Sequence, residues 1–320
     1  MNASFIRQSH PLRAMLCATL VTLLVLLMFP LAGDRAQAAP GDVALVSSDA
    51  AWAQANNASY EPAISADGRY VAFQSQATNL VSPATSLKQI FRKDLVTGEV
   101  RLVSASAAGD EGNSGLSESP SISADGRYVA FGSDSTNLVS PATGGYQVFR
   151  KDLVTGEVKL VSANAAGVQG EFGGGSASIS ADGRYVAFDS PSTNLVSPAT
   201  SLNQIFRKDL VTGEVKLCSA NAAGIQGNDG GGGTSSIAPS ISSDGRYVAF
   251  DSYSTNLVSP ATSGEHVFHK DLVTGEVKLC SSDAAGVQGT AVARVHPSRP
   301  TAGTWPSIPR PPTWSPPQPA

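Results

Sequence analysis

The stretch ISADGRYVAF, Ile64–Phe73, decides the fold of this chain because it occurs four times. Closely similar copies occupy Ile122–Phe131, Ile179–Phe188 and Ile241–Phe250. The Asp-Gly pairs begin at residues 67, 125, 182 and 244, so the copies follow one another at intervals of 58, 57 and 62 residues. Self-similarity at such a period is the signature of a repeat architecture, in which each repeat forms one supersecondary unit.

Each unit of about sixty residues is predicted to form four β-strands. The first is short and rich in small residues, at Pro120–Ser123 of the second unit. The Asp-Gly pair then predicts a tight hairpin turn, because glycine tolerates the positive φ that such turns require. The second strand, Arg69–Phe73, is apolar on both faces, and we therefore expect it to be covered on both sides.

A second block, IFRKDLVTGEVRLVS at Ile90–Ser104, closes each unit, and its counterparts end at Ser162, Ser219 and Ser281. It predicts a third strand at Ile90–Phe91, a Thr-Gly turn and a fourth strand at Glu99–Val103. Charged and apolar residues alternate in the fourth strand, as is typical of an outer, half-solvated strand. The Arg-Lys pairs that precede an aspartate in this block are interpreted as neutralised charge at a strand edge.

Tandem four-stranded sheets with buried inner strands predict an all-β fold, a β-propeller. The repeat domain spans residues 39–293, with blades at about 60–104, 118–162, 176–219 and 238–281. A β-solenoid is the alternative, but its rungs are shorter and lack paired hairpin turns. Val43–Ser48 matches the end of a fourth strand, which predicts an extra N-terminal outer strand and an incomplete ring.

The Pro-Ser-Ile-Ser-Ala-Asp-Gly-Arg-Tyr-Val-Ala-Phe block resembles the WD40-like Pro-Asp repeat of TolB-type β-propellers, found in exported bacterial proteins. It is also similar to the propellers that precede prolyl-oligopeptidase domains. The chain departs from TolB because no α/β domain precedes its repeats. It also lacks the acidic segment that many secreted relatives carry, since Ser82–Gln89 contains no carboxylate. No metal is therefore expected there, because calcium needs several oxygen ligands in one loop.

The N-terminus has the features of a secretory signal peptide at residues 1–38. Arg7 and Arg13 form a basic region, an apolar stretch follows at residues 14–32, and Ala36-Gln37-Ala38 provides the cleavage pattern. A retained membrane anchor is the alternative, because the apolar stretch approaches the length of a spanning helix. With the leader removed, no membrane span is expected and the protein is predicted to be periplasmic or secreted.

Two cysteines remain after cleavage, Cys218 and Cys280, where the other units carry Val103 and Val161. Both are predicted to be free, buried thiols that replace a core valine. Residues 39–293 contain 16 Lys and Arg against 25 Asp and Glu, a net charge of −9. Such a field repels nucleic acid and anionic lipid, so neither is an expected partner.

Residues 294–320 are predicted to be a disordered tail read in a shifted frame. Back-translation of His296–Ala320 and a shift of two bases gives Ser-Ile-Ser-Ala-Asp-Gly-Arg-Tyr-Val-Ala-Phe, followed by the text of repeat three to Ser201. In each shifted codon the observed residues leave only the first base open to choice, and the agreement with the repeat extends over about two dozen codons. The gene is therefore expected to encode at least a fifth repeat, and a Pro-rich ligand segment is the alternative interpretation.

No catalytic, cofactor or metal site is predicted. His266 and His269 depart from the repeat in one unit only and are interpreted as drift, and no Gly-x-Ser-x-Gly motif is present. The glycine runs 173–175 and 230–233 are interpreted as flexible linkers between blades. The repeated Asp-Gly turns at Asp67, Asp125, Asp182 and Asp244 are assigned to hairpin geometry, with an acidic ring for a cationic ligand as the alternative.

The sequence therefore predicts an exported, non-enzymatic scaffold that binds an unknown protein or glycan and that can self-associate through open blade edges. A structural or adhesive surface protein and a non-functional product of a frameshifted gene are the alternatives.

Overall fold

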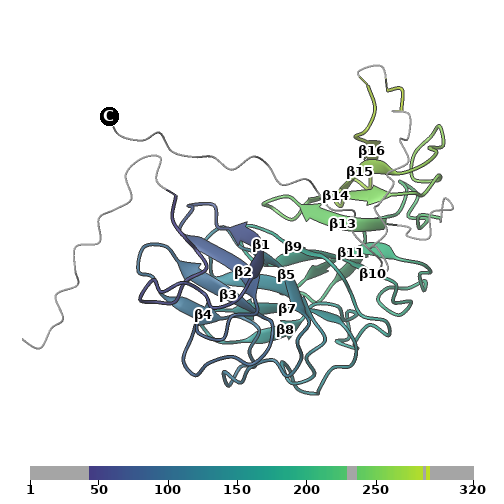
Figure 1. Ribbon diagram of the computed structural model, residues 1–320. Helices are drawn as coiled ribbons and strands as arrows, with labels where there is room; N and C mark the ends of the chain where they lie inside the picture. Colours follow the sequence, from purple (N-terminus) through teal and green to yellow (C-terminus); the bar gives the residue numbers. More distant parts are fainter. Residues whose placement is uncertain (1–42, 229–235, 284–285, 289–320) are drawn as a thin grey trace, which may run out of the picture. The chain divides into compact units, whose positions relative to one another are not determined.

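The computed structural model of this protein describes residues 43–228, 236–283 and 286–288. The predicted signal peptide (residues 1–38), the predicted shifted tail (294–320) and the glycine run 230–233 lie outside these residues. Within the described part, all regular structure is β-strand (Figure 1). No helix there is long and apolar enough to cross a membrane.

Four sheets of four strands follow one another along the chain as four blades. Blade 1 contains β1 (Ser59–Ile64), β2 (Tyr70–Ser75), β3 (Gln89–Asp94) and β4 (Val100–Leu102). Blade 2 contains β5 (Ser117–Ile122), β6 (Tyr128–Ser133), β7 (Gln147–Asp152) and β8 (Val158–Leu160). Blade 3 contains β9 (Ala177–Ile179), β10 (Tyr185–Ser190), β11 (Gln204–Asp209) and β12 (Val215–Leu217). Blade 4 contains β13 (Ser236–Ile241), β14 (Tyr247–Ser252), β15 (His266–Asp271) and β16 (Val277–Leu279).

Within each blade the strands pair antiparallel in sequence order, as the prediction of an all-β propeller requires. The Asp-Gly hairpin is confirmed, because Gly68 adopts a φ of 72° between β1 and β2. The Asp67 carboxylate accepts hydrogen bonds from Ser65 Oγ (2.5 Å) and from the backbone N–H of Arg69 (3.0 Å). The same side chain thus closes the turn and sets the register of the two strands.

The hydrophobic core lies between successive blades. In the cluster at the first boundary, Ala72, Ile90 and Val103 of blade 1 pack against Val129 and Phe131 of blade 2. Equivalent clusters join blade 2 to blade 3 and blade 3 to blade 4. The second strands of blades 1 to 3 are therefore buried on both faces, as their apolar sequence predicts, whereas one face of β14 in blade 4 is only partly buried.

The third strand was wrongly predicted as a short run with charge at its edge. β7 extends over six residues, and all of them are buried. Arg150 donates to the Gly183 carbonyl of the next blade (2.8 Å), and Lys151 Nζ donates to the Ala105 and Ser106 carbonyls (3.1 and 2.8 Å). These cations are buried because they hydrogen-bond backbone carbonyls across the blade boundaries.

The predicted outer strand at Val43–Ser48 is not formed. A fourth strand pairs with the third strand of its own blade, and the described residues contain no such strand for this segment. Val46 instead packs against the core of blade 1, and Ser48 forms a single bridge with Gln54. The predicted incomplete ring concerns the overall shape and stays a prediction.

Two further predictions are corrected. Cys218 and Cys280 are free thiols, as predicted, but only Cys218 is buried, because a following blade covers it and none in the described residues covers Cys280. The run Gly173–Gly175 is not a simple linker. Gly174 N–H donates to the Tyr146 carbonyl (3.0 Å) and Gly175 N–H to the Asp189 carbonyl (2.8 Å), so the run is fixed to its neighbours by backbone hydrogen bonds.

Candidate binding site

The four repeats differ from one another at a small set of positions that the fold brings to one end of each blade. One position lies near the end of the second strand and holds Gln74, Gly132, Asp189 and Asp251 in turn. A second lies just before the third strand and holds Lys88, Tyr146, Asn203 and Glu265. A third lies at the start of the first strand, where Tyr60 pairs with Gln74 and Glu118 pairs with Gly132. Variation is therefore concentrated at this end of the blades.

An ion pair joins blade 1 to blade 2 at this end. Lys88 Nζ lies 2.9 Å from Glu118 Oε2, and the two side chains retain 17% and 36% of their exposure. Both residues occupy variable positions, so the pair exists at this boundary and at no other in the described chain. Partial exposure leaves both groups accessible to a ligand.

Tyr146 fills the next place in blade 2. Its hydroxyl donates to Glu118 Oε1 at 3.4 Å. Burial, together with the neighbouring Glu118 carboxylate, raises the pKa of Tyr146, so that the phenol stays protonated. The ring lies where a side chain at position 132 would stand, because a Cβ added to Gly132 would collide with the Tyr146 ring and hydroxyl. Gly132 therefore makes room for Tyr146.

Asp189 and Asn203 continue the series in blade 3. Asn203 Nδ2 donates to Asp189 Oδ2 at 3.1 Å. Burial raises the pKa of the Asp189 carboxyl, and the hydrogen bond from Asn203 opposes that effect. A Cβ at Gly175 would lie 2.7 Å from the Asp189 carboxylate oxygens, so the glycine provides the space that the carboxylate occupies.

We call Lys88, Glu118, Tyr146, Asp189 and Asn203 the variable cluster. It contains a cation, two carboxyl groups, a phenol and an amide, drawn from three consecutive blades. Glycines at 132 and 175 are matched to its side chains. Such a set offers both hydrogen-bond donors and acceptors beside an aromatic ring, which suits recognition of a polar ligand. Sequence reasoning missed the cluster, because isolated departures from a repeat were interpreted as drift.

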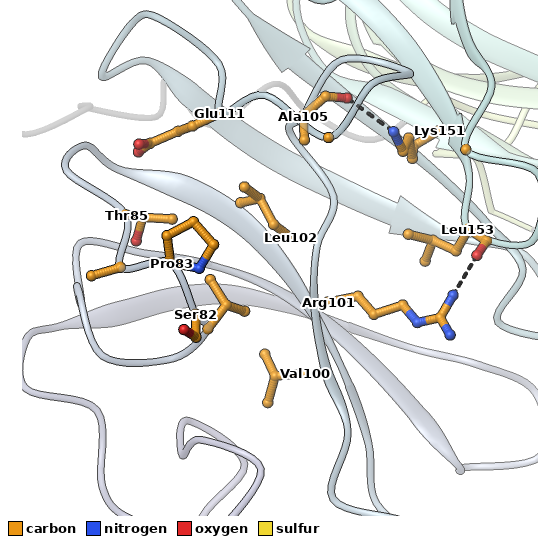
Figure 2. Close-up of a pocket in the computed structure, with 14 residues that line it drawn as sticks. Ser82, Pro83, Thr85, Val100, Arg101, Leu102, Ala105, Glu111, Lys151 and Leu153 are labelled. Carbon is orange, nitrogen blue, oxygen red and sulfur yellow. Dashed lines mark hydrogen bonds between the residues drawn. The ribbon is translucent and has the colours of Figure 1, made fainter.

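The cavities at the outer side of the blade boundaries have a different character. Figure 2 shows one of 380 Å³ between blades 1 and 2, where Arg101 donates to the Leu153 carbonyl (2.6 Å) and Lys151 to the Ala105 carbonyl. A second, of 530 Å³, lies between blades 2 and 3, where Lys159 donates to the Leu210 carbonyl (3.4 Å). The lining is mostly of residues that recur in each repeat, so these cavities follow from blade packing.

The residues singled out in the sequence have structural roles. His266 replaces the buried glutamine that begins the third strand and contacts Ser281 Oγ (2.8 Å) and the Ser263 carbonyl (3.0 Å), as Gln147 contacts Ser162 and Gly144. The His269 ring stacks on Tyr247 with centroids 4.9 Å apart. The Asp-Gly turn aspartates Asp67, Asp125, Asp182 and Asp244 each hydrogen-bond within their own turn. Within the described residues, no three His, Cys, Asp or Glu side chains are grouped to hold a metal ion.

No family model and no curated protein matches the chain. Among solved structures, TolB from Acinetobacter baumannii is 23% identical with a TM-score of 0.41, over 70% of this chain and 43% of that one. The putative TolB from Agrobacterium tumefaciens is 19% identical with a TM-score of 0.43, over 68% of this chain and 63% of that one. Oligogalacturonate lyase in complex with manganese is 16% identical with a TM-score of 0.41, over 69% and 51%.

The chain thus spans less than two thirds of the length of the TolB chains that it matches. The similarity concerns the fold alone: the solved structures that resemble this chain are TolB-type and related β-propeller proteins.

Proposed function

We propose that this protein is an exported, non-enzymatic β-propeller scaffold that binds a protein or glycan partner through the variable cluster. The periplasm or the cell exterior is the proposed compartment, on the basis of the signal-peptide pattern at residues 1–38. The blades act as a rigid frame, and the cluster supplies recognition.

One observation carries the proposal. The repeats are nearly identical in their strands, turns and boundary hydrogen bonds, yet side chains at a few equivalent positions differ. These side chains contact one another within blades 2 and 3 and, through Lys88 and Glu118, across the boundary between blades 1 and 2. Packing alone requires the same residue in each repeat, because the boundaries are alike. Specific recognition by a repeat protein instead requires different side chains on a common frame.

The test compares binding by the wild-type chain with binding by Lys88→Gln and Asn203→Ala variants. Each protein is probed with a glycan array and with an envelope extract. A partner that uses the cluster should bind each variant at least about tenfold more weakly, the usual effect of removing one charged hydrogen-bonding contact.

Lys278→Gln is the matched control, because it removes the same charge from a lysine that is 63% exposed and lies outside the cluster. A partner that is lost equally from Lys278→Gln and Lys88→Gln responds to net charge and contradicts the proposal. A partner that binds all three variants as the wild type does contradicts it as well.

A further inference from the structure

One face of blade 4 is constructed as a blade boundary, but no described residue covers it. Ile90, Val148 and Ile205 are the second residues of the third strands of blades 1 to 3 and are fully buried against the next blade. Their counterpart Val267 is 38% exposed. Val103, Val161 and Cys218 are likewise fully buried, whereas Cys280 is exposed.

The boundary hydrogen bonds end at the same place. Arg101, Lys159 and Lys216 each donate to a leucine carbonyl of the following blade, at 2.6, 3.4 and 3.4 Å. The next residue in this series is Lys278, which is 63% exposed and pairs only with Glu276 of its own blade. Blade 4 therefore presents both the apolar and the donor elements of an interface that occurs three times within the chain.

The segment Val46–Gln54 shows what lies on the opposite side of blade 1. Val46 packs on the core of blade 1, as Val103 packs on the core of blade 2. The bridge between Ser48 and Gln54 matches that between Ala105 and Glu111. Lys93 donates to the Ser48 carbonyl (3.1 Å), as Lys151 donates to the Ala105 carbonyl (3.1 Å).

Val46–Gln54 is thus the connection that leaves the fourth strand of a preceding blade. Val43–Leu45 occupy the place in the sequence of that fourth strand, by alignment with β4 (Val100–Leu102). The blade that this segment belongs to requires three more strands. Blade 4 requires a following blade with those same three strands.

A second copy of the chain does not satisfy both requirements. Each internal boundary contains one connecting segment, such as Val103–Glu111 at the first. Docking blade 1 of a second copy on blade 4 would bring two such segments, Val46–Gln54 and Cys280–Gln288, to one boundary. A further blade that follows residue 288 in the same chain would bring only one connecting segment to that boundary.

The sequence beyond the described residues encodes such a blade in another frame. Val295 followed by His296 and Pro297, shifted by two bases, gives Pro-Ser from GTC CAT CC. The shifted codons then run through the text of Ile179–Leu202, which contains the second strand and ends just before the third. Tryptophan has a single codon, TGG, so the third base at Trp305 and Trp314 is fixed as G. In the shifted frame this G is the first base of the codons GCC and GTC, which encode the alanine and the valine that the repeat has at these places.

We propose that the uncovered face of blade 4 is a docking site for a fifth blade of the same repeat. Its first strands are encoded out of frame by the codons of residues 295–320. In the frame-restored protein the fifth blade covers Val267 and Cys280.

The first experiment reads the nucleotide sequence of the gene from codon 283 onward. The expected result is that codons 295–320, read in the shifted frame, encode the repeat. The bases that follow them should encode the third strand of that repeat in the same frame. Third bases that do not encode the repeat in the shifted frame, or Ser and Arg codons from the other codon families, overturn the proposal.

The second experiment measures thiol labelling by mass spectrometry in the full chain and in a frame-restored chain. Cys280 should be labelled about tenfold or more slowly once the fifth blade covers it, because a buried thiol reacts only after local opening. Cys218, buried in both proteins, is the internal control.

Cys280 that is labelled equally fast in both chains overturns the proposal. Protection of Cys280 in the chain as it stands, increasing with protein concentration, assigns the face to a second copy instead and overturns it too. A Val267→Asp variant of the frame-restored chain should restore fast labelling of Cys280, since a carboxylate in that boundary prevents the fifth blade from docking.

Discussion

At the scale of single residues, Asp189 shows that the variable cluster is not optimised for stability. Its carboxyl is largely removed from water, and one side-chain donor, Asn203, compensates it. Burial raises the pKa of Asp189 in the folded chain above its value in the unfolded chain. The contribution of this group to stability is therefore complete below the unfolded pKa and decreases as the pH rises above it.

We expect Asp189→Asn to increase the free energy of unfolding at pH 7 by about 1 kcal/mol, because it removes a poorly solvated charge. The gain should disappear below about pH 4, where the wild-type carboxyl is protonated in both states. Urea unfolding at both pH values measures it. Asp182→Asn is the control, since that aspartate closes an exposed turn. An Asp189→Asn variant that is less stable at pH 7 would contradict the interpretation.

Gly132 is a second residue whose identity depends on its neighbour. Gly132→Ala should destabilise the fold by about 1–3 kcal/mol, because the added methyl group overlaps the Tyr146 ring. Thermal unfolding of Gly132→Ala measures the loss. The double variant with Tyr146→Ser should recover most of it, and failure to recover would place the strain elsewhere.

The sequence predicted some of these residues and not others, for a physical reason. Asp67 and Gly68 are recognised because a tight turn imposes a local requirement on φ that any sequence must meet. Lys88 and Glu118 are 30 residues apart, and only the packing of blade 1 against blade 2 brings them to 2.9 Å. Their relation is invisible until the blade boundary is known, so the candidate site could not be predicted.

At the scale of the element, the third strand contains the buried cation that links consecutive blades. Lys151 in β7 is buried, and its ammonium donates to two carbonyls of the connection that leaves blade 1. Burial lowers the pKa of Lys151, which measures the cost of desolvating the ammonium. The two hydrogen bonds offset that cost and fix the connection against β7.

We expect Lys151→Met to destabilise the protein by about 2–4 kcal/mol, because the methionine keeps the packing volume and leaves two carbonyls without their donor. Lys159→Met, on the half-exposed β8, is the matched control and should cost less than about 1 kcal/mol. Equal losses from the two variants, in urea unfolding, would show that the buried hydrogen bonds contribute little.

The length of this element also marks the limit of sequence reasoning. In the sequence, the apolar residues Ile90 and Phe91 predict a strand. The polar residues on either side, Gln89 and Arg92–Asp94, predict that the strand ends there. Gln89, Arg92 and Lys93 are buried because backbone carbonyls of adjoining segments accept hydrogen bonds from them. Asp94 is buried because Arg69 of its own blade donates two hydrogen bonds to it. Hydrophobic periodicity identifies a strand that has one face in water, and β3 has no face in water.

At the scale of the whole molecule, one ion pair per blade holds the second strand to the turn after the third. Asp152 accepts two hydrogen bonds from Arg127 (3.0 and 2.7 Å) and one from the Val154 amide (2.8 Å). These donors hold the pKa of Asp152 well below its usual range, although burial opposes them. Its three counterparts, Asp94, Asp209 and Asp271, are shifted in the same direction.

A carboxyl group whose pKa is lower in the folded state than in the unfolded state stabilises the fold at pH values above its unfolded-state pKa. This stabilisation is lost as the pH falls toward the folded-state pKa. We therefore expect stability to be nearly constant from about pH 7 to 5 and to fall steeply below about pH 4. Thermal midpoints across this range measure the effect. Asp152→Asn should lower the midpoint at pH 7 and flatten its acid dependence, and an unchanged acid dependence would contradict this assignment.

The hairpin turns of successive blades are joined by one backbone hydrogen bond at each boundary. Ala66 N–H donates to the Ala124 carbonyl, Ala124 to Ala181, and Ala181 to Ser243, at 3.1, 3.0 and 3.0 Å. Because each of these bonds uses main-chain atoms, it forms between any two copies of the unit whatever their side chains. A recombination event that duplicates or deletes one unit therefore keeps this backbone hydrogen bond at every junction, so the number of blades can change without loss of the contact that joins the turns.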